Sequence, residues 1–136
     1  MKRATGIGGI FFKTKNPERA RDWYRDHLGL DTDQWGTCFE WKQTEDSGKK
    51  GFTQWTPASR DSKMFAEHQD FMINYRVSDL TKLVDVLKQE GVKVLDEIEE
   101  FEYGKFVHIE DPEGHRIQLW EPNDEEFDKI VDGRTK

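Results

Sequence analysis

A chain of 136 residues is long enough for one domain, or for two small halves that share one core. Its 28 acidic and 21 basic residues leave a net charge of −7, which argues against nucleic acid or an anionic membrane as a partner. Hydrophobic residues make up only 34% of the chain, but aromatic residues make up 12% and supply large core side chains, so we expect a folded protein with a polar surface.

The single cysteine, Cys38, excludes an internal disulfide and fits a reducing compartment. The sequence contains neither a secretory leader nor an apolar run long enough to span a membrane, so we expect neither export nor membrane insertion. The cytoplasm is therefore the expected location.

In the first half, residues 8–14 (GGIFFKT) predict a strand. Asn16 and Pro17 are typical of a helix start, and apolar residues then recur at helical spacing until Gly29 ends the helix. The further strands predicted in this half are a weak one over residues 31–35, followed by 38–42 and 51–57.

In the second half, residues 58–70 have no clear period and are predicted to be a linker. Ser78 and Asp79 begin a helix with apolar residues at i, i+3, i+4 and i+7, and Gly91 ends it. The strands predicted here are 71–77, a strand pair or one long bent strand over 92–101, and a hairpin over 106–120. The tail from Asn123 carries one or two amphipathic turns that either dock or fray.

The chain contains an internal repeat. Residues 106–122 (FVHIEDPEGHRIQLWEP) form a strand, a turn and a strand, and residues 38–57 carry a degraded copy with a longer loop. The chain therefore divides into a first β-α-β-β-β module (7–57), a linker (58–70), a second such module (71–122) and a tail (123–136). Neither half is large enough to bury a good core alone, so we expect the halves to pair.

This order resembles the vicinal oxygen chelate superfamily, which includes glyoxalase I, bleomycin-resistance proteins and extradiol dioxygenases. The resemblance is carried by IFFKTKNPERARDWY (10–24), YRVSDLTKLVDVLKQEGV (75–92) and DPEGHRIQLWEP (111–122). It implies an α+β fold in which the two modules form a cup-shaped, curved mixed sheet with helices outside. It also implies a homodimer.

The resemblance further identifies the positions at which metal-dependent members hold their ion. These positions carry Gly9, Thr53, Met72 and Gln118. A hard divalent cation needs several oxygen or imidazole ligands, and only Gln118 is a plausible one. We therefore expect no metal or other cofactor.

Strand alternation extends this alignment to the rest of the cup. The side chains expected to face inward are Phe11, Lys13, Cys38, Glu40, Lys42, Trp55, Asn74, Arg76, Phe106, His108, Glu110 and Trp120. The opposite faces of these strands are almost wholly apolar and are expected to pack under the helices, among them Phe12, Phe39, Trp41, Phe52, Val77, Val107 and Leu119.

Glu40 and His108 occupy equivalent positions in the two modules, so a carboxylate beside an imidazole would suit acid–base catalysis. The alternatives are an internal hydrogen-bonded pair or two unrelated solvated groups. Lys13 and Arg76, also equivalent, could hold an anionic group, or could pair with Glu110 or Glu40.

Trp55 and Trp120 are a third equivalent pair, and they could stack a planar ligand or instead fill the core or a dimer seam. Asn74 and Gln118 could orient a polar ligand atom. The expected function is binding of a small, partly aromatic or anionic molecule in a cup that lacks the usual metal ligands. One alternative is an enzyme, either metal-dependent and glyoxalase-, lyase- or dioxygenase-like, or metal-free with Glu40 and His108. The other is a structural or partner-docking domain whose cup is filled by its own side chains.

Overall fold

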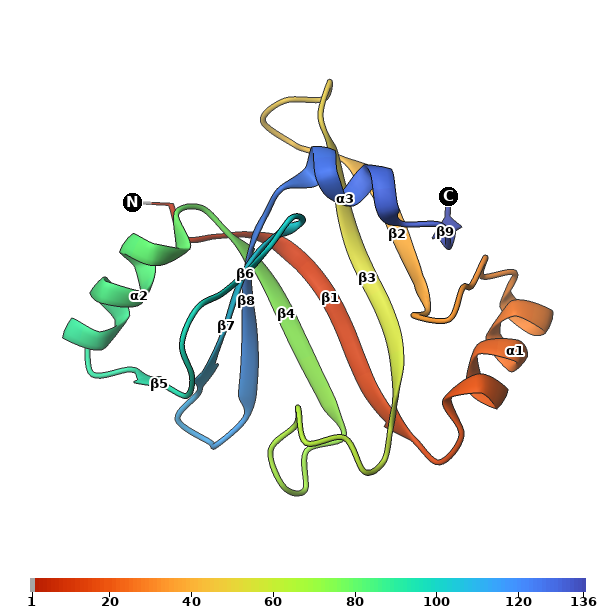
Figure 1. Ribbon diagram of the computed structural model, residues 1–136, viewed down its shortest axis with the longest axis horizontal. Helices are drawn as coiled ribbons and strands as arrows, with labels where there is room; N and C mark the ends of the chain where they lie inside the picture. The colour runs from red at the N-terminus through yellow and green to blue at the C-terminus, as the bar shows by residue number, and fades with distance from the viewer. Residues whose placement is uncertain (1) are drawn as a thin grey trace.

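The computed structural model of the protein describes residues 2–136. Its elements in chain order are β1 (Ala4–Thr14), α1 (Pro17–Leu28), β2 (Thr37–Lys42), β3 (Lys50–Ser59), β4 (Phe71–Val77), α2 (Leu80–Gln89), β5 (Lys93–Val94), β6 (Glu99–Phe101), β7 (Gly104–Glu110), β8 (Arg116–Pro122), α3 (Asp124–Ile130) and β9 (Arg134–Thr135). The strands form one curved sheet, with α1 and α2 at its two sides and α3 across its upper end (Figure 1). None of the helices formed by residues 2–136 is long and apolar enough to cross a membrane.

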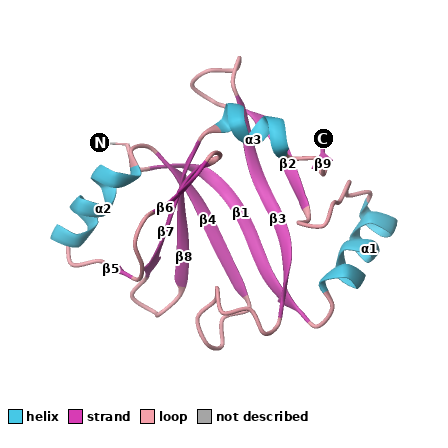
Figure 2. Cartoon of the chain, in the orientation of Figure 1, coloured by secondary structure: helices cyan, strands magenta, loops and turns pink. Residues whose placement is uncertain are grey.

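The two halves of the sheet meet at an antiparallel seam between β1 and β4. β3 pairs parallel with β1, and β8 pairs parallel with β4, so each half repeats the same arrangement around the seam. The strand order is β5-β7-β8-β4-β1-β3-β2-β9, with β6 beside β7, and the sheet is open. The predicted α+β fold, a curved mixed sheet with helices outside, is therefore confirmed (Figure 2).

Helix α1 begins and ends where the sequence predicts. The Asn16 carboxamide accepts a hydrogen bond from the Arg19 amide (3.0 Å), and Gly29 ends the helix with a left-handed φ of 73°. Tyr24 packs edge-on against Trp55, with ring centroids 4.8 Å apart, which holds α1 on the outer face of β3.

Helix α2 covers the outer face of the second module. The Asp79 carboxylate caps its first turn by accepting from the Lys82 amide (3.3 Å). Its apolar face closes a core that consists of Val77, Leu80, Leu83, Val84, Val107 and Leu119. Burying a side chain of this size contributes roughly 1.5–3 kcal/mol each, so this cluster anchors the module.

The outer edge of the first module differs from the prediction. The weak strand expected over residues 31–35 is reduced to an isolated bridge between Asp33 and Gly36. The free edge of β2 is instead covered by β9, which pairs parallel with it at Cys38 and Phe39. The C-terminal segment thus supplies the strand that the first module lacks, and this removes an exposed edge.

Residues 123–136, which we call the C-terminal strap, dock onto the sheet. Phe127 of α3 contacts the ring of Phe52 on β3, with centroids 5.1 Å apart. Arg134 donates to the carboxylates of Glu40 (2.8 Å) and Asp128 (2.7 Å). Because Phe52 meets α3, it faces the same side as the strap and not the outer helices, which corrects the face predicted for it.

The loop over residues 60–70 is ordered at the opposite end of the sheet. Gln69 donates to the Arg116 carbonyl and accepts from the Arg116 amide, each at 2.9 Å, which ties the loop to the start of β8. Phe65 is buried, and the Lys13 ammonium lies 5.3 Å from its ring centroid. The predicted linker therefore closes the lower end of the cup.

Acid should weaken the docking of the C-terminal strap. The hydrogen bond from Arg134 holds the pKa of the Asp128 carboxyl below its usual value. A carboxyl whose folded-state pKa is lowered stabilises the fold above its unfolded pKa of about 3.9, and this contribution is lost as the pH falls through the folded pKa. We expect Asp128→Asn to lower the Tm at pH 7, and we expect this effect to shrink as the pH falls below about 3.9 and through the lower folded-state pKa.

Thermal melting between pH 7 and pH 2.5 measures this difference. Asp61→Asn, which changes an exposed loop carboxylate, is the matched control and should follow the parent protein at every pH. A constant Tm difference between Asp128→Asn and the parent across the range would contradict the assignment.

Candidate functional site

Four strands bring one row of residues together at the bottom of the cup. Gly9 on β1 pairs with Asn74 on β4, Asn74 with Gln118 on β8, and Gln118 with His108 on β7. Residues that pair across neighbouring strands share a face of the sheet. The row therefore runs across the seam between the modules and forms the floor of the cup.

A line of hydrogen bonds joins the side chains of this floor. Asn74 donates its amide to the Gln118 amide oxygen (2.7 Å), and the Gln118 amide nitrogen lies 3.3 Å from His108 Nε2. The Asp96 carboxylate accepts from both the His108 backbone amide (2.8 Å) and the Nδ1 side of its ring (2.7 Å). Because a carboxylate only accepts, the Nδ1 atom that faces Asp96 carries a proton.

Asn74 ends this line beneath the floor. Its side chain is 2% exposed, and its Oδ1 has no hydrogen-bond partner among residues 2–136. Gly8 makes room for this amide, since a Cβ at position 8 would lie 2.2 Å from Asn74 Oδ1. The floor therefore depends on a glycine at the point where the β1–β4 register shifts.

The predicted pairing of Glu40 with His108 is wrong. β2 and β7 lie on opposite sides of the sheet, with β3, β1, β4 and β8 between them. Glu40 accepts from Arg134 (2.8 Å), and the carboxylate beside His108 is Asp96. The sequence signal that could have found Asp96 is the strand or strand pair predicted over residues 92–101. This segment pairs with the strand that carries His108, and the Leu95 amide donates to the His108 carbonyl (2.9 Å).

The predicted face of β3 is also wrong, by one residue. Trp55 packs against Phe12, with ring centroids 5.3 Å apart, and lies beneath α1 rather than in the cup. Thr53 shares that outer face and donates its hydroxyl to the Ile7 carbonyl (2.6 Å). The parallel register pairs Gly9 with Gln54, so Gln54 takes the cup-facing position.

Arg76 lies at the upper end of the cup and already holds a carboxylate. It is 4% exposed, and its guanidinium carbon lies 5.1 Å from the ring centroid of Trp41 and 5.5 Å from that of Trp120. Its two terminal nitrogens donate to the two oxygens of Asp124, at 2.8 and 2.5 Å. Neither of the predicted partners, Glu110 or Glu40, contacts it, because the carboxylate arrives on α3.

The remaining predicted residues separate to the two ends of the cup. Lys13 lies at the lower end over Phe65, so it is not beside Arg76. Trp120 lies at the upper end on the cup face, stacked on Phe106 with centroids 5.6 Å apart and planes 7° apart. Its Nε1 donates to the Tyr103 carbonyl (3.0 Å).

Cys38 contributes no nucleophile. It is fully buried, and burial raises the pKa of its thiol to about 11. The thiolate is therefore scarce near neutral pH.

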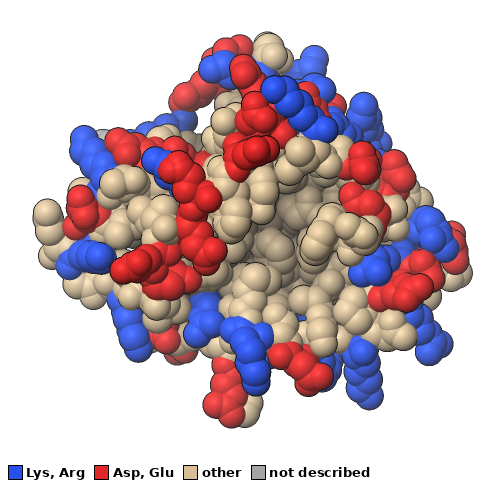
Figure 3. Space-filling view, in the orientation of Figure 1, with Lys and Arg blue, Asp and Glu red and all other residues tan. Residues whose placement is uncertain are grey.

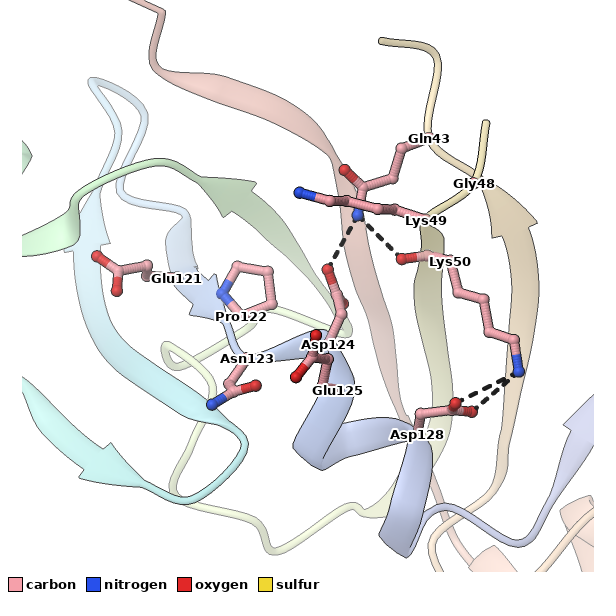
Figure 4. A pocket seen from close by; sticks show the side chains of 10 residues that line it. All are labelled: Gln43, Gly48, Lys49, Lys50, Glu121, Pro122, Asn123, Asp124, Glu125 and Asp128. Carbon is pink, nitrogen blue, oxygen red and sulfur yellow. Dashed lines mark hydrogen bonds and ion pairs between the residues drawn. The ribbon is translucent and has the colours of Figure 1, made fainter. Parts of the chain in front are cut away.

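A polar cavity of about 660 Å³ lies beside α3, between the strap and the loop that connects β2 to β3 (Figure 4). Acidic side chains outnumber lysines in its lining, and Lys50 donates to Asp128, at 3.3 Å from both carboxylate oxygens. Gln43 crosses it and donates to Asp124 (3.1 Å). A second cavity of about 330 Å³ reaches Arg76 and Asp124 from another side.

Comparison with known proteins identifies the family. A profile of the Glyoxalase/Bleomycin resistance protein/Dioxygenase superfamily matches residues 6–119. The chain belongs to this superfamily. No curated protein matches the chain.

Solved structures of this superfamily share the fold. A methylmalonyl-CoA epimerase variant from Streptomyces coelicolor has a TM-score of 0.66 and 17% identity, over 88% of this chain and 99% of that chain. The epimerase from Mycobacterium tuberculosis has a TM-score of 0.58 and 21% identity, over 88% and 89%. The Mn(II)-bound glyoxalase from Novosphingobium aromaticivorans has a TM-score of 0.64 and 14% identity, over 100% of this chain and 42% of that chain. At these identities the likeness concerns the fold alone.

The residues of the cup do not fit the divalent ion of metal-dependent members. Gly9 has no side chain, Met72 offers only a buried soft sulfur, and Thr53 faces away from the cup. Gln54, which takes the place of Thr53, offers one amide oxygen, and two amide oxygens with Gln118 are too few for a hard divalent ion. The Gln118 amide oxygen already accepts from Asn74. Within residues 2–136, no group of three or more His, Cys, Asp or Glu side chains converges on one point.

Gly8→Ala should destabilise the floor. The added Cβ would lie 2.2 Å from Asn74 Oδ1 and 3.0 Å from carbons of Arg76 and Trp120. Overpacking of this kind costs about 1–3 kcal/mol, so we expect the free energy of unfolding to fall by about that amount.

Gly6→Ala is the matched control on the same strand, because the nearest atom to its Cβ, in Trp41, would be 3.4 Å away. Its change should stay within about 1 kcal/mol. Urea unfolding of both variants measures the difference, and equal midpoints would refute the close approach at Gly8.

Proposed function

We propose that the protein binds a small, flat, partly polar organic molecule in the cup, without the divalent ion used by metal-dependent members of its superfamily. The observation that carries the proposal is the floor itself. His108 and Gln118 present hydrogen-bonding groups that are held in place by Asp96 and Asn74. Pre-positioned polar groups at the bottom of a mostly apolar hollow are typical of small-molecule sites.

The surroundings support a ligand that is aromatic rather than highly charged. The space-filling view shows a hollow in this face whose floor and walls are formed by uncharged residues, with charged residues around it (Figure 3). Phe106 and Trp120 provide stacked rings on one side. The guanidinium groups of Arg76 and Arg134 are paired with carboxylates, so neither is left to bind a charged ligand in the closed protein.

A second candidate function is acid–base catalysis without a metal, with Asp96 in place of the predicted Glu40. Asp96 holds the His108 ring in one orientation with a proton on Nδ1. The His108 side chain is 17% exposed, so a solute can reach it. An imidazole oriented by a carboxylate is a common general base. On this hypothesis His108→Ala abolishes turnover without a change in fold, and Asp96→Asn lowers kcat about 100-fold.

Benzamide is a suitable probe for the binding proposal, because its ring suits the walls and its carboxamide complements the floor. We expect titration with benzamide to shift the side-chain amide signals of Gln118 and Asn74 in ¹H–¹⁵N spectra. Removal of one neutral hydrogen-bond partner costs roughly 0.5–1.5 kcal/mol, so Gln118→Leu should weaken binding about 3- to 10-fold.

Gln89→Leu, which changes an exposed amide at the end of α2 and outside the cup, is the control and should leave the affinity unchanged. Treatment with EDTA should not alter binding either. Shifts confined to other regions, or a stoichiometric ion held by side chains of the cup, would overturn the proposal.

The homodimer and the cytoplasmic location stay predictions. Light scattering of the purified protein at several concentrations measures the molar mass and so tests the homodimer.

A further inference from the structure

We propose that Asp124 and Phe127 of α3 occupy the place of an aromatic carboxylate, and that the upper half of the cup binds such a compound when the C-terminal strap is displaced. This inference rests on the proposed function, because it uses the same cup. It goes further by assigning a second subsite and the chemical class of its ligand.

The carboxylate half of this subsite is built by the body of the domain. Arg76 of β4 binds Asp124 through two parallel hydrogen bonds (2.8 and 2.5 Å), which is the geometry that guanidinium groups adopt with carboxylates. Gln43 adds a third donor to the same carboxylate (3.1 Å). Trp41 and Trp120 lie against the guanidinium, so its position does not depend on the strap. Only the acceptor comes from α3.

The aromatic half is equally pre-built. The ring of Phe127 lies 5.1 Å from Phe52, 5.3 Å from Trp120 and 6.4 Å from Tyr103, measured between centroids. Phe52 is fully buried and Trp120 is 3% exposed. The place of the Phe127 ring, which we call the aromatic slot, is therefore lined by rings that pack into the body of the domain. These rings lie on β3, β8 and the turn before β7, and they come from both modules.

Asp124 and Phe127 are joined by helical geometry. Residues three apart lie on the same face of a helix, so α3 presents a carboxylate and a phenyl ring side by side. A small molecule with a ring and a carboxylate on a short spacer carries the same two groups. Trp120 contacts both halves, which makes the two parts of the subsite continuous.

The strap is held in a way that permits exchange. Helix α3 spans Asp124–Ile130, has no fully buried residue, and is too short to be stable in isolation. Its other polar anchor is Asp128, which pairs with Lys50 and Arg134. The strand pairing that follows it involves only the two residues of β9. Cavities of about 660 and 330 Å³ both reach Asp124, so solvent and solutes approach the carboxylate from two sides.

The buried charge of Arg76 favours states in which a carboxylate is bound beside it. A buried guanidinium without a partner is strongly unfavourable, so states in which a carboxylate pairs with Arg76 are favoured. In the closed protein Asp124 supplies it at the high effective concentration of an attached segment. An external carboxylate therefore competes with Asp124, and removing the competitor raises the apparent affinity.

The test compares 3-phenylpropionate with its neutral analogue 3-phenylpropanamide by isothermal titration calorimetry. Asp124→Asn keeps the shape and a hydrogen-bond acceptor beside Arg76 but removes the competing charge. Asp124→Asn combined with Phe127→Ala also empties the aromatic slot. We expect 3-phenylpropionate to bind the double variant at least tenfold more tightly than the parent protein, and the single variant to an intermediate degree.

The propanamide should show no such gain. Glu125→Gln, on the same turn of α3, is the matched control and should bind as the parent does. If the double variant is too unstable for titration, its Tm must rise with added 3-phenylpropionate and not with the amide, because a ligand of the folded state stabilises it. Equal affinities of parent and variants, equal gains for acid and amide, or no selective rise in Tm would overturn the inference.

Benzamide separates this inference from the proposed function. If benzamide still shifts the Gln118 amide while 3-phenylpropionate fails to distinguish the variants, the subsite is wrong and the floor site stands. If 3-phenylpropionate behaves as expected but benzamide does not bind at the floor, the proposed function of the floor is wrong and the upper subsite stands.

Discussion

The antiparallel seam between β1 and β4 is the constraint on which the molecule depends. It joins two modules that are each too small to bury a good core, and it brings one row of residues from both modules onto a common floor. The seam is close enough at Gly8 that any larger residue would meet the Asn74 amide. Backbone approach at this one point therefore controls both the pairing of the modules and the position of the polar groups in the cup.

The cup divides into two chemically different halves. Its floor presents amide and imidazole groups, fixed by a line of hydrogen bonds that ends at Asp96. Its upper part is aromatic and is closed by the C-terminal strap through a buried ion pair and the ring of Phe127. The superfamily of this chain includes a Mn(II)-bound glyoxalase, whereas the cup of this chain has amides in its floor and its own C-terminal strap against the upper aromatic residues.

The C-terminal strap both covers an edge of the sheet and supplies a charged group to the cup. Its last residues pair with β2, where the first module lacks a strand, while its helix contributes Asp124 to Arg76. One short segment therefore completes the sheet and neutralises the buried guanidinium. Because its helix has no buried residue and its strand has only two residues, the strap is the part of the fold that solvent conditions and competing solutes most readily affect.

The sequence alone determined the helices, the hairpins and the duplicated order of elements, because caps such as Asn16 and Asp79 and the alternation within each strand are local signals. It did not determine which strands face which way across the sheet. A slip of one residue reverses every side chain of a strand, and only the β1–β3 register places Gln54 rather than Trp55 in the cup. The tertiary structure also chose the partners of the charged groups: the carboxylate of His108 lies 12 residues away and that of Arg76 lies 48 residues away. Among so many acidic side chains, proximity after folding decides the pairing, and no pattern along the chain records it.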